Sequence, residues 1–198
     1  MAELQTERRI EVADLYTYEE LRNFVVNCER CPLSRGRTHA VMGKGPVTAK
    51  IMFVGEGPGR QEDQKGEPFV GPSGALFDKM LSEAGLSRRD VYITNIVKCR
   101  PPCNRDPEKD EQAVCMEYLK YETALVRPEM LVALGRVAAQ RIIREDIKIT
   151  REHGKVFERK GFKLMAMFHP AALLRDPGKV AETARDFKKI AEILGSDK

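Results

Sequence analysis

Long apolar runs are missing from this chain of 198 residues, and none approaches the roughly 20 consecutive apolar residues that a membrane helix needs. The first residues are charged and lack the apolar core of a secretory signal peptide, so we expect a cytoplasmic protein without membrane contact. Internal repeats, low-complexity tracts and long linkers are also lacking, so nothing divides the chain into separate domains. The net charge of +4 is small and permits an anionic partner without requiring one.

The composition that remains is that of an ordinary globular protein. Hydrophobic residues make up 42% of the chain and charged residues 32%, which is typical of a folded domain. A chain of this length is long enough to bury a core of its own. We therefore predict a single domain over 1–198, with about 1–16 as an N-terminal extension.

Short apolar runs alternate with segments of helical pattern. The runs predict strands over 51–54, 91–97 and 130–134, and a hairpin over 156–168, turning at Lys160-Gly161, whose second arm is a fourth strand. Helices are expected over about 18–27, 74–84, 135–145 and 178–194, and from Asp106-Pro107 onward. This alternation predicts an α/β fold, a three-layer α/β/α arrangement around a central, mostly parallel, four-stranded sheet.

Capping residues mark where several helices should begin. Thr17 followed by Glu20 forms a capping box for the first helix. Ser73 is expected to cap the helix that Gly85 ends, and Asp106 to cap the one that follows it. Between them, 56–72 is rich in glycine and proline and is expected to be a long structured loop.

Polar signatures stand at the ends of three predicted strands. Glu56 follows the first strand within Gly55-Glu56-Gly57-Pro58-Gly59, Asn95 lies in the second, and His169 follows the fourth. Ligands of parallel α/β sheets bind in the crevice beyond the carboxyl ends of the strands. The sequence therefore predicts that a carboxylate, an amide and an imidazole meet on one rim. Taken alone, the asparagine could equally serve a turn and the histidine a cap.

The five cysteines predict a metal site. Cys28 and Cys31 form a CxxC pair at the end of the first helix, and Cys99 and Cys115 lie far along the chain. A cytosolic chain able to bury a core disfavours disulfides, and metal ligation is the better explanation of the CxxC pair. Structural zinc sites usually show compact paired spacings, whereas four scattered thiolates suit a 4Fe–4S cluster; the spacing leaves both open. Cys103 alone reads as an inert thiol.

Five segments, taken in order, resemble the family 4 uracil-DNA glycosylases, the iron–sulfur members of the uracil-DNA glycosylase superfamily. One such segment alone would be weak evidence for the family, but five segments in the family's order over about 20–190 are specific evidence. They are Cys28-Glu29-Arg30-Cys31-Pro32-Leu33, Gly55-Glu56-Gly57-Pro58-Gly59 with Glu62-Asp63, Gly66-Glu67-Pro68-Phe69-Val70-Gly71, Thr94-Asn95-Ile96-Val97-Lys98-Cys99-Arg100-Pro101-Pro102 and His169-Pro170-Ala171-Ala172-Leu173-Leu174-Arg175.

The resemblance implies a DNA-repair enzyme that hydrolyses the N-glycosidic bond of deoxyuridine in single- and double-stranded DNA, releasing uracil and leaving an abasic site. It implies a structural 4Fe–4S cluster on Cys28, Cys31, Cys99 and Cys115. The implied partner is uracil-containing DNA at the nucleoid, bound by a monomer, with a sliding-clamp contact left open. A related branch that cross-links to DNA carries a histidine in a basic insertion, and 99–105 has none, which favours a turnover enzyme.

Uracil excision suggests a role for each rim residue. His169 can donate to uracil O2 as negative charge develops there, and Asn95 can accept from N3–H and donate to O4. Phe69 can stack on the base, and Glu56 can position water or stabilise the sugar cation, with Glu62 and Asp63 as second choices. Backbone N–H groups near Gly57 complete the expected uracil pocket, which comprises Gly55, Glu56, Gly57, Phe69, Asn95 and His169.

Outside the pocket, we expect basic residues to contact the DNA backbone and one leucine to insert into the base stack as a wedge. Leu173 or Leu174 could fill the gap that the extruded base leaves, and Arg175 could contact phosphate. Lys98, Arg100 and the N-terminus of the helix at Ser73 are further phosphate candidates.

Two alternatives of other classes remain at this point. An electron-transfer module would use the cluster for redox cycling, and it would leave Glu56, Asn95, Phe69 and His169 unexplained. A zinc-stabilised nucleic-acid-binding domain would bind DNA in a salt-sensitive way without releasing a base.

Overall fold

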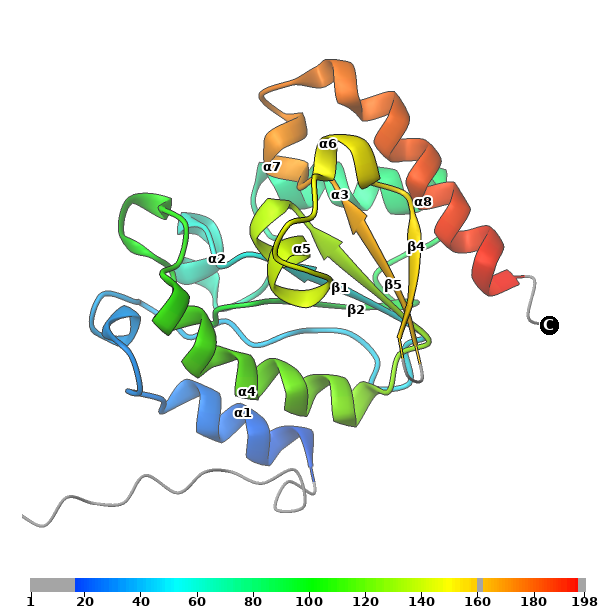
Figure 1. Ribbon diagram of the computed structural model, residues 1–198. Helices are drawn as coiled ribbons and strands as arrows, with labels where there is room; N and C mark the ends of the chain where they lie inside the picture. The colour runs from blue at the N-terminus through cyan, green and yellow to red at the C-terminus, as the bar shows by residue number, and fades with distance from the viewer. Residues whose placement is uncertain (1–16, 160–161, 196–198) are drawn as a thin grey trace, which may run out of the picture.

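The computed structural model describes residues 17–159 and 162–195 (Figure 1). At its centre lies a five-stranded sheet in the order β2-β1-β3-β5-β4. Its strands are β1 (Ile51–Gly55), β2 (Val91–Asn95), β3 (Met130–Leu134), β4 (Val156–Arg159) and β5 (Phe162–Met167). The expected N-terminal extension over 1–16 and the hairpin turn at Lys160-Gly161 lie outside the described residues.

The mostly parallel sheet is confirmed, but the expected number of strands is too low by one. Four strands run parallel to one another, in the order β2, β1, β3 and β5. The fifth, β4, pairs antiparallel with β5, from Val156 opposite Met165 to Arg159 opposite Phe162. The first arm of the predicted hairpin is therefore a strand of the sheet. As an edge strand it is only partly buried, so it lacks the continuous apolar run that marks a central strand.

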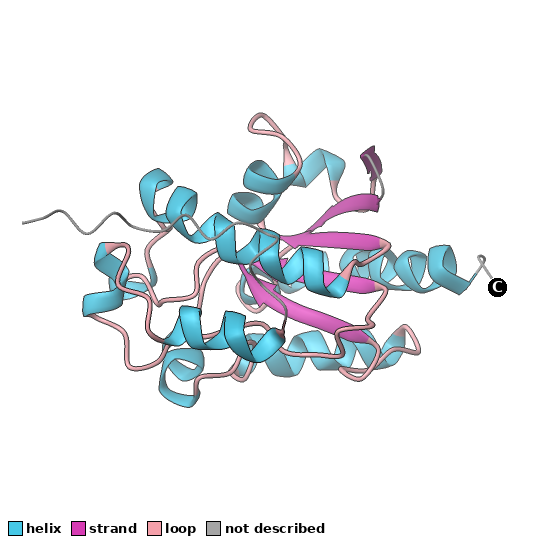
Figure 2. Cartoon of the chain, turned by 90° about the horizontal axis from the view of Figure 1, so that it is seen from below, coloured by secondary structure: helices cyan, strands magenta, loops and turns pink. Residues whose placement is uncertain are grey.

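Helices cover both faces of the sheet, which confirms the three-layer α/β/α fold (Figures 1 and 2). On one face, α1 (Tyr18–Val26), α4 (Lys109–Val126) and α5 (Arg136–Ile142) pack on side chains such as Met52 and Val54. On the other, α3 (Pro72–Glu83), α7 (Pro170–Leu173) and α8 (Val180–Gly195) pack on side chains such as Ile51 and Phe53. Alternate residues of each strand thus serve separate cores.

Helix boundaries follow the expected caps in part. Thr17 is confirmed as the N-cap of α1, because Thr17 Oγ1 accepts from Glu20 N at 3.2 Å, and its hydroxyl donates to Glu20 Oε2 at 2.8 Å. Ser73 is not a cap, since α3 already begins at Pro72 after Gly71. Asp106 is not a cap either, since α4 begins after Glu108, whose N–H is satisfied by Glu111. Asp106 is left available for another role.

Short elements were not expected from the sequence. The loop over 56–72 contains α2 (Arg60–Lys65), and α6 (Ile149–Glu152) precedes β4. Short 3₁₀ turns lie at Pro32–Arg35, Pro102–Asn104 and Pro177–Lys179. No helix within the described residues is long and apolar enough to cross a membrane.

Candidate active site

The carboxyl ends of the parallel strands form one rim of the sheet. Gly55 at the end of β1 lies opposite Asn95 at the end of β2. The pairing continues beyond the strands, because Ile96 N donates to Gly55 O at 2.9 Å and Val97 N donates to Glu56 O at 3.1 Å. These bonds keep the first two polar signatures side by side.

A cavity of about 680 Å³ opens at this rim. It is lined by residues that follow β1, β2, β3 and β5, together with residues of the loop before α3. The residues with candidate roles among them are Glu56, Gly57, Glu62, Phe69, Ser73, Asn95, Asp106, Arg136, His169, Leu174 and Arg175. The structure therefore brings the carboxylate, the amide and the imidazole to one concave site.

Asn95 presents an unused hydrogen-bond acceptor to this site. The residue is 2% exposed, and its Oδ1 atom is buried without a hydrogen-bond partner among the described residues. Gly55 allows this placement, because a Cβ there would overlap Asn95 Oδ1. A buried acceptor without a partner is costly, so the cavity favours a ligand that brings an N–H group to Oδ1.

His169 is held as a neutral ring with one defined donor. It is the N-cap of α7, and its Nδ1 accepts from Ala171 N at 3.1 Å. A backbone N–H group can only donate, so Nδ1 carries no proton and the proton of the neutral ring is on Nε2. Burial lowers the pKa of His169 to about 4, which keeps the ring neutral near pH 7. The capping role and a donor role in the cavity are thus compatible.

Phe69 forms an aromatic wall of the same cavity. Its side chain is 3% exposed, and its ring centroid lies 5.5 Å from that of His169. A Cβ on Gly55 would approach the Phe69 ring at 3.0 Å, so the glycine seats the ring as well as the amide. A planar base entering the cavity would meet an aromatic face here.

Glu56 is a half-buried carboxyl group with a perturbed pKa. The pKa of Glu56 is raised to about 7: burial is the largest cause, the carboxylate of Asp106 contributes to the rise, and Arg136 opposes it. Asp106 and Arg136 pair with each other and line the cavity. A carboxyl group that is partly ionised near pH 7 is suited to general-base work.

The sequence motifs do not predict the pair that tunes Glu56, because the pattern at Asp106 predicts a helix cap and Arg136 stands in none of the motifs. The sequence does mark Arg136 as a candidate for the rim, since it follows Gly135 directly after β3. The carboxyl-end rule that selected the other rim residues applies equally to that strand.

The two second-choice carboxylates hold loops together. Glu62 Oε1 accepts from Val70 N and from Gly71 N at 3.0 Å each. Asp63 Oδ1 accepts from Thr38 N at 2.8 Å. Both side chains are more than nine-tenths buried, so neither is a solvated loop charge.

The candidate DNA contacts divide by burial. Lys98 is 1% exposed and bonded to Glu122, so it cannot reach a phosphate and that expectation is corrected. Leu173 is 1% exposed within the core, whereas Leu174 is 49% exposed at the cavity edge. The burial of Leu173 leaves Leu174 as the wedge candidate. Arg175 lies exposed at the same edge.

Comparison with known proteins now identifies the family. Residues 42–195 match the family model of the uracil DNA glycosylase superfamily. The chain belongs to the uracil-DNA glycosylase superfamily. Within it, the type-4 uracil-DNA glycosylase of Archaeoglobus fulgidus is 48% identical over 86% of this chain and 90% of the relative. That of Thermotoga maritima is 43% identical over 82% of this chain and 88% of the relative.

The type-4 group is supported over its neighbour. A type-5 uracil-DNA glycosylase of Pyrobaculum aerophilum covers 89% of this chain and 90% of its own length, but at 31% identity. The family suggested by the motifs is therefore confirmed, and with it the expectation of an enzyme of the DNA glycosylase class, a hydrolase.

In this type-4 glycosylase, four cysteines come from three converging segments. Cys28 and Cys31 follow α1, Cys99 follows β2 and Cys115 lies in α4. Helices α1 and α4 lie side by side (Figure 1). The pKa of Cys115 is raised to about 12, chiefly by burial; Lys98 opposes the rise, and Cys99 and Cys28 contribute to it. Cys103 is exposed.

Four cysteine thiolates are the donors that a 4Fe–4S cluster takes, and four cysteines also suit zinc. Among the described residues, no three His, Cys, Asp or Glu side chains gather closely enough to hold a single metal ion. Donors already face the sulfur atoms, since Arg37 Nη1 lies 3.2 Å from Cys99 Sγ and Lys98 N lies 3.3 Å from Cys115 Sγ.

Proposed function

We propose that the protein hydrolyses the N-glycosidic bond of deoxyuridine in single- and double-stranded DNA, releasing uracil and leaving an abasic site. The observation that carries the proposal is the buried Oδ1 of Asn95 in the rim cavity, which has no hydrogen-bond partner among the described residues. Uracil offers an N–H donor at N3, which would satisfy this acceptor. Cytosine offers an acceptor there, which would leave two acceptors facing each other.

The base must leave the duplex before it can enter this cavity. Phe69 would stack on its face, and Leu174 would occupy the space left in the duplex. Arg175 and Arg100 would contact phosphates, as would the N-terminus of α3 at Ser73, which lines the cavity. The flanking backbone of Gly55 and Gly57 would fit closely against the base.

Departure of uracil places negative charge on the base, which His169 would stabilise. Its Nε2–H is the donor left by the bond from Ala171 to Nδ1. A donor aimed at uracil O2 strengthens as the bond to the sugar breaks, and this strengthening lowers the barrier. A neutral donor suits the role because it need not lose a proton to the leaving base.

Water completes the reaction at the sugar. Glu56 in its ionised form would orient a water molecule toward C1′ and accept its proton as the C1′–O bond forms. The electron pair of the C1′–N1 bond leaves with uracil, so atoms and charge balance without an oxidant or a reductant. Asp106 and Arg136 would set the pH at which Glu56 is ionised.

A 4Fe–4S cluster would be held by Cys28, Cys31, Cys99 and Cys115. When bound, it would supply a structural cross-link between α1, α4 and the loop after β2 rather than electrons for the reaction. We further propose that the enzyme acts as a monomer in the cytoplasm, at the nucleoid where its DNA substrate lies.

An end-labelled oligonucleotide with one deoxyuridine tests the proposal. After incubation and alkali treatment, we expect cleavage at the uracil in both single and double strands, and loss of cleavage with Asn95→Ala. Intact DNA from a brown, iron-replete, folded protein would contradict the proposal and favour an electron-transfer module. A colourless, zinc-bound protein that binds DNA without base release would favour the nucleic-acid-binding alternative.

A further inference from the structure

The backbone of Phe69 has a conformation that residues with side chains rarely adopt. Its φ of 53° lies in the left-handed region, where a bulky residue is strained and must be held by its neighbours. Its ring centroid lies 5.4 Å from that of Phe77 and 5.5 Å from that of His169. Because the ring is a wall of the rim cavity, this backbone conformation sets where a base can stack.

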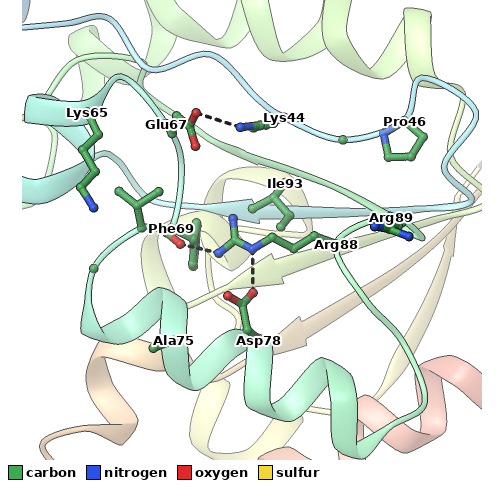
Figure 3. A pocket seen from close by; sticks show the side chains of 13 residues that line it. Lys44, Pro46, Lys65, Glu67, Phe69, Ala75, Asp78, Arg88, Arg89 and Ile93 are labelled. Carbon is green, nitrogen blue, oxygen red and sulfur yellow. Dashed lines mark hydrogen bonds and ion pairs between the residues drawn. The ribbon is translucent and has the colours of Figure 1, made fainter.

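Arg88, which is not among the residues lining the rim cavity, holds the backbone at Phe69 by hydrogen bonds (Figure 3). Its Nη2 donates to Phe69 O, and its Nη1 donates to Pro68 O at 3.2 Å. Its Nε donates to Asp78 Oδ1 at 2.7 Å, so α3 fixes the guanidinium plane. One rigid cation thus engages two consecutive carbonyl groups, a geometry that the single ammonium group of lysine cannot reproduce.

Two further features hold the same loop. Glu62 Oε1 accepts from the N–H groups of Val70 and Gly71, at 3.0 Å each, on the other side of Phe69. Gly74 is required beneath it, because a Cβ there would overlap the Phe69 carbonyl oxygen. The loop is therefore held by a cation on its carbonyl side and a carboxylate on its amide side.

Arg88 lines a second cavity, of about 740 Å³, which shares Phe69 with the rim cavity. Four cationic side chains line this second cavity, Lys44, Lys65, Arg88 and Arg89. Lys44 pairs with Glu67 at 2.8 Å, and Arg88 pairs with Asp78 and donates to the loop (Figure 3). These pairings favour a supporting role for Arg88 over ligand binding.

We infer that Arg88 is a positioning residue of the base pocket: by clamping the carbonyl groups of Pro68 and Phe69, it holds the Phe69 ring where an extruded base stacks. Asp78 orients the clamp. The inference rests on the proposed function only in taking that base to be uracil. Arg88 itself touches neither the base nor the DNA backbone in this role.

The variants Arg88→Ala and Arg88→Lys test the clamp, with Arg89→Ala as the matched control. Arg89 is the adjacent exposed arginine on the same cavity, and its side chain lies away from Phe69 (Figure 3). For each variant we would measure kcat/KM for uracil excision, inhibition by free uracil, binding to DNA with a baseless site analogue, and amide exchange at Val70 and Gly71.

For Arg88→Ala we expect kcat/KM to fall about 10- to 100-fold, as for loss of hydrogen bonds to a charged group. Inhibition by free uracil should weaken by a similar factor, while binding of baseless DNA stays unchanged. Amide exchange in the loop should quicken, and added guanidinium ion should restore part of the excision. The kcat/KM and the uracil inhibition of Arg88→Lys should lie between those of the wild type and those of Arg88→Ala. Arg89→Ala should have the values of the wild type.

Two results would overturn the inference. One is full excision and uracil inhibition in Arg88→Ala; the other is loss of baseless-DNA binding in parallel with excision, which indicates a general fold defect. If Arg88→Ala melts early, the same comparison is made with Arg88→Lys. Should the wild type itself not excise uracil, the proposed function fails, while the amide-exchange comparison still decides whether Arg88 holds the loop.

Discussion

Lys98 Nζ lies 2.5 Å from Glu122 Oε2, and the two side chains are 2% and 0% exposed. Lys98 Nζ also donates to Thr94 Oγ1 at 2.6 Å and to Asn95 O at 2.9 Å. Glu122 Oε1 accepts from Gly43 N at 2.8 Å. The pair is thus fully bonded inside the core and contacts the backbone of Asn95, a residue that lines the rim cavity; Lys98 also precedes Cys99 directly in the sequence.

Breaking the Lys98–Glu122 pair should lower the free energy of unfolding more than breaking an ion pair at the surface. Lys98→Met leaves the Glu122 carboxylate buried without its cation, and we expect the free energy of unfolding to fall by about 3–5 kcal/mol. Adding Glu122→Leu should recover much of the loss, because both buried charges are then removed. Urea denaturation measures both effects.

The control for this prediction is Lys109→Met. Lys109 pairs with Glu145 at 3.0 Å, and the two side chains are 90% and 85% exposed. Lys109→Met should therefore change the free energy of unfolding negligibly. Equal effects of Lys98→Met and Lys109→Met would show that the buried pair contributes nothing special to stability.

The activity should depend on the ionisation of Glu56. Its pKa is raised to about 7, and the ionised form is the base, so kcat/KM should rise with pH through about 7 and then level off. His169, with a pKa of about 4, stays neutral over this range. Steady-state rates between about pH 5 and pH 9 would give the profile, and a flat profile would exclude Glu56 as the base.

Substitutions beside Glu56 should move that profile in opposite directions. Asp106→Asn removes the carboxylate that raises the pKa of Glu56, so the acidic limb should move to lower pH. Arg136→Gln removes the cation that lowers this pKa, so the limb should move to higher pH. The same rate measurements check both variants, and shifts in the same direction would contradict the assignment.

The parts of the site that could be predicted are those written locally in the sequence. Glu56, Asn95 and His169 each follow or end an apolar run, and the geometry of parallel sheets brings such positions together. Lys98 could not be placed this way, because a lysine in a polar segment resembles a surface residue. Only its partner Glu122, 24 residues away, explains its burial, and that contact is tertiary.

The support of Phe69 shows the same limit. Its position in a glycine- and proline-rich loop suggested a base-stacking role, but nothing local indicates its left-handed backbone. Arg88 lies 19 residues along the chain from Phe69, on the far side of α3 in the sequence, so its contact with the loop is tertiary. Residues that touch a ligand stand at motif positions, whereas residues that hold those motifs in place come from packing.

The cysteines should divide into four ligands and one spare. Cys28→Ser or Cys115→Ser should lower the iron content and the brown visible absorbance of the purified protein, and lower its melting temperature, because the link between α1 and α4 is lost. Cys103→Ser is the control, since Cys103 is exposed and should leave all three properties unchanged. Iron loss on Cys103→Ser, with retention on Cys99→Ser, would reverse the assignment of these two residues.

Leu173 and Leu174 are neighbours of the same type with opposite exposures, 1% and 49%. Leu174→Ala should slow excision from double-stranded DNA more than from single-stranded DNA, because only the duplex has a stack to fill, and should leave stability unchanged. Leu173→Ala should instead lower the free energy of unfolding by about 2–5 kcal/mol by opening a cavity in the core, without a strand preference. Comparing rates on both substrates with urea denaturation separates the two roles. An equal loss on both strands for Leu174→Ala would reject the wedge.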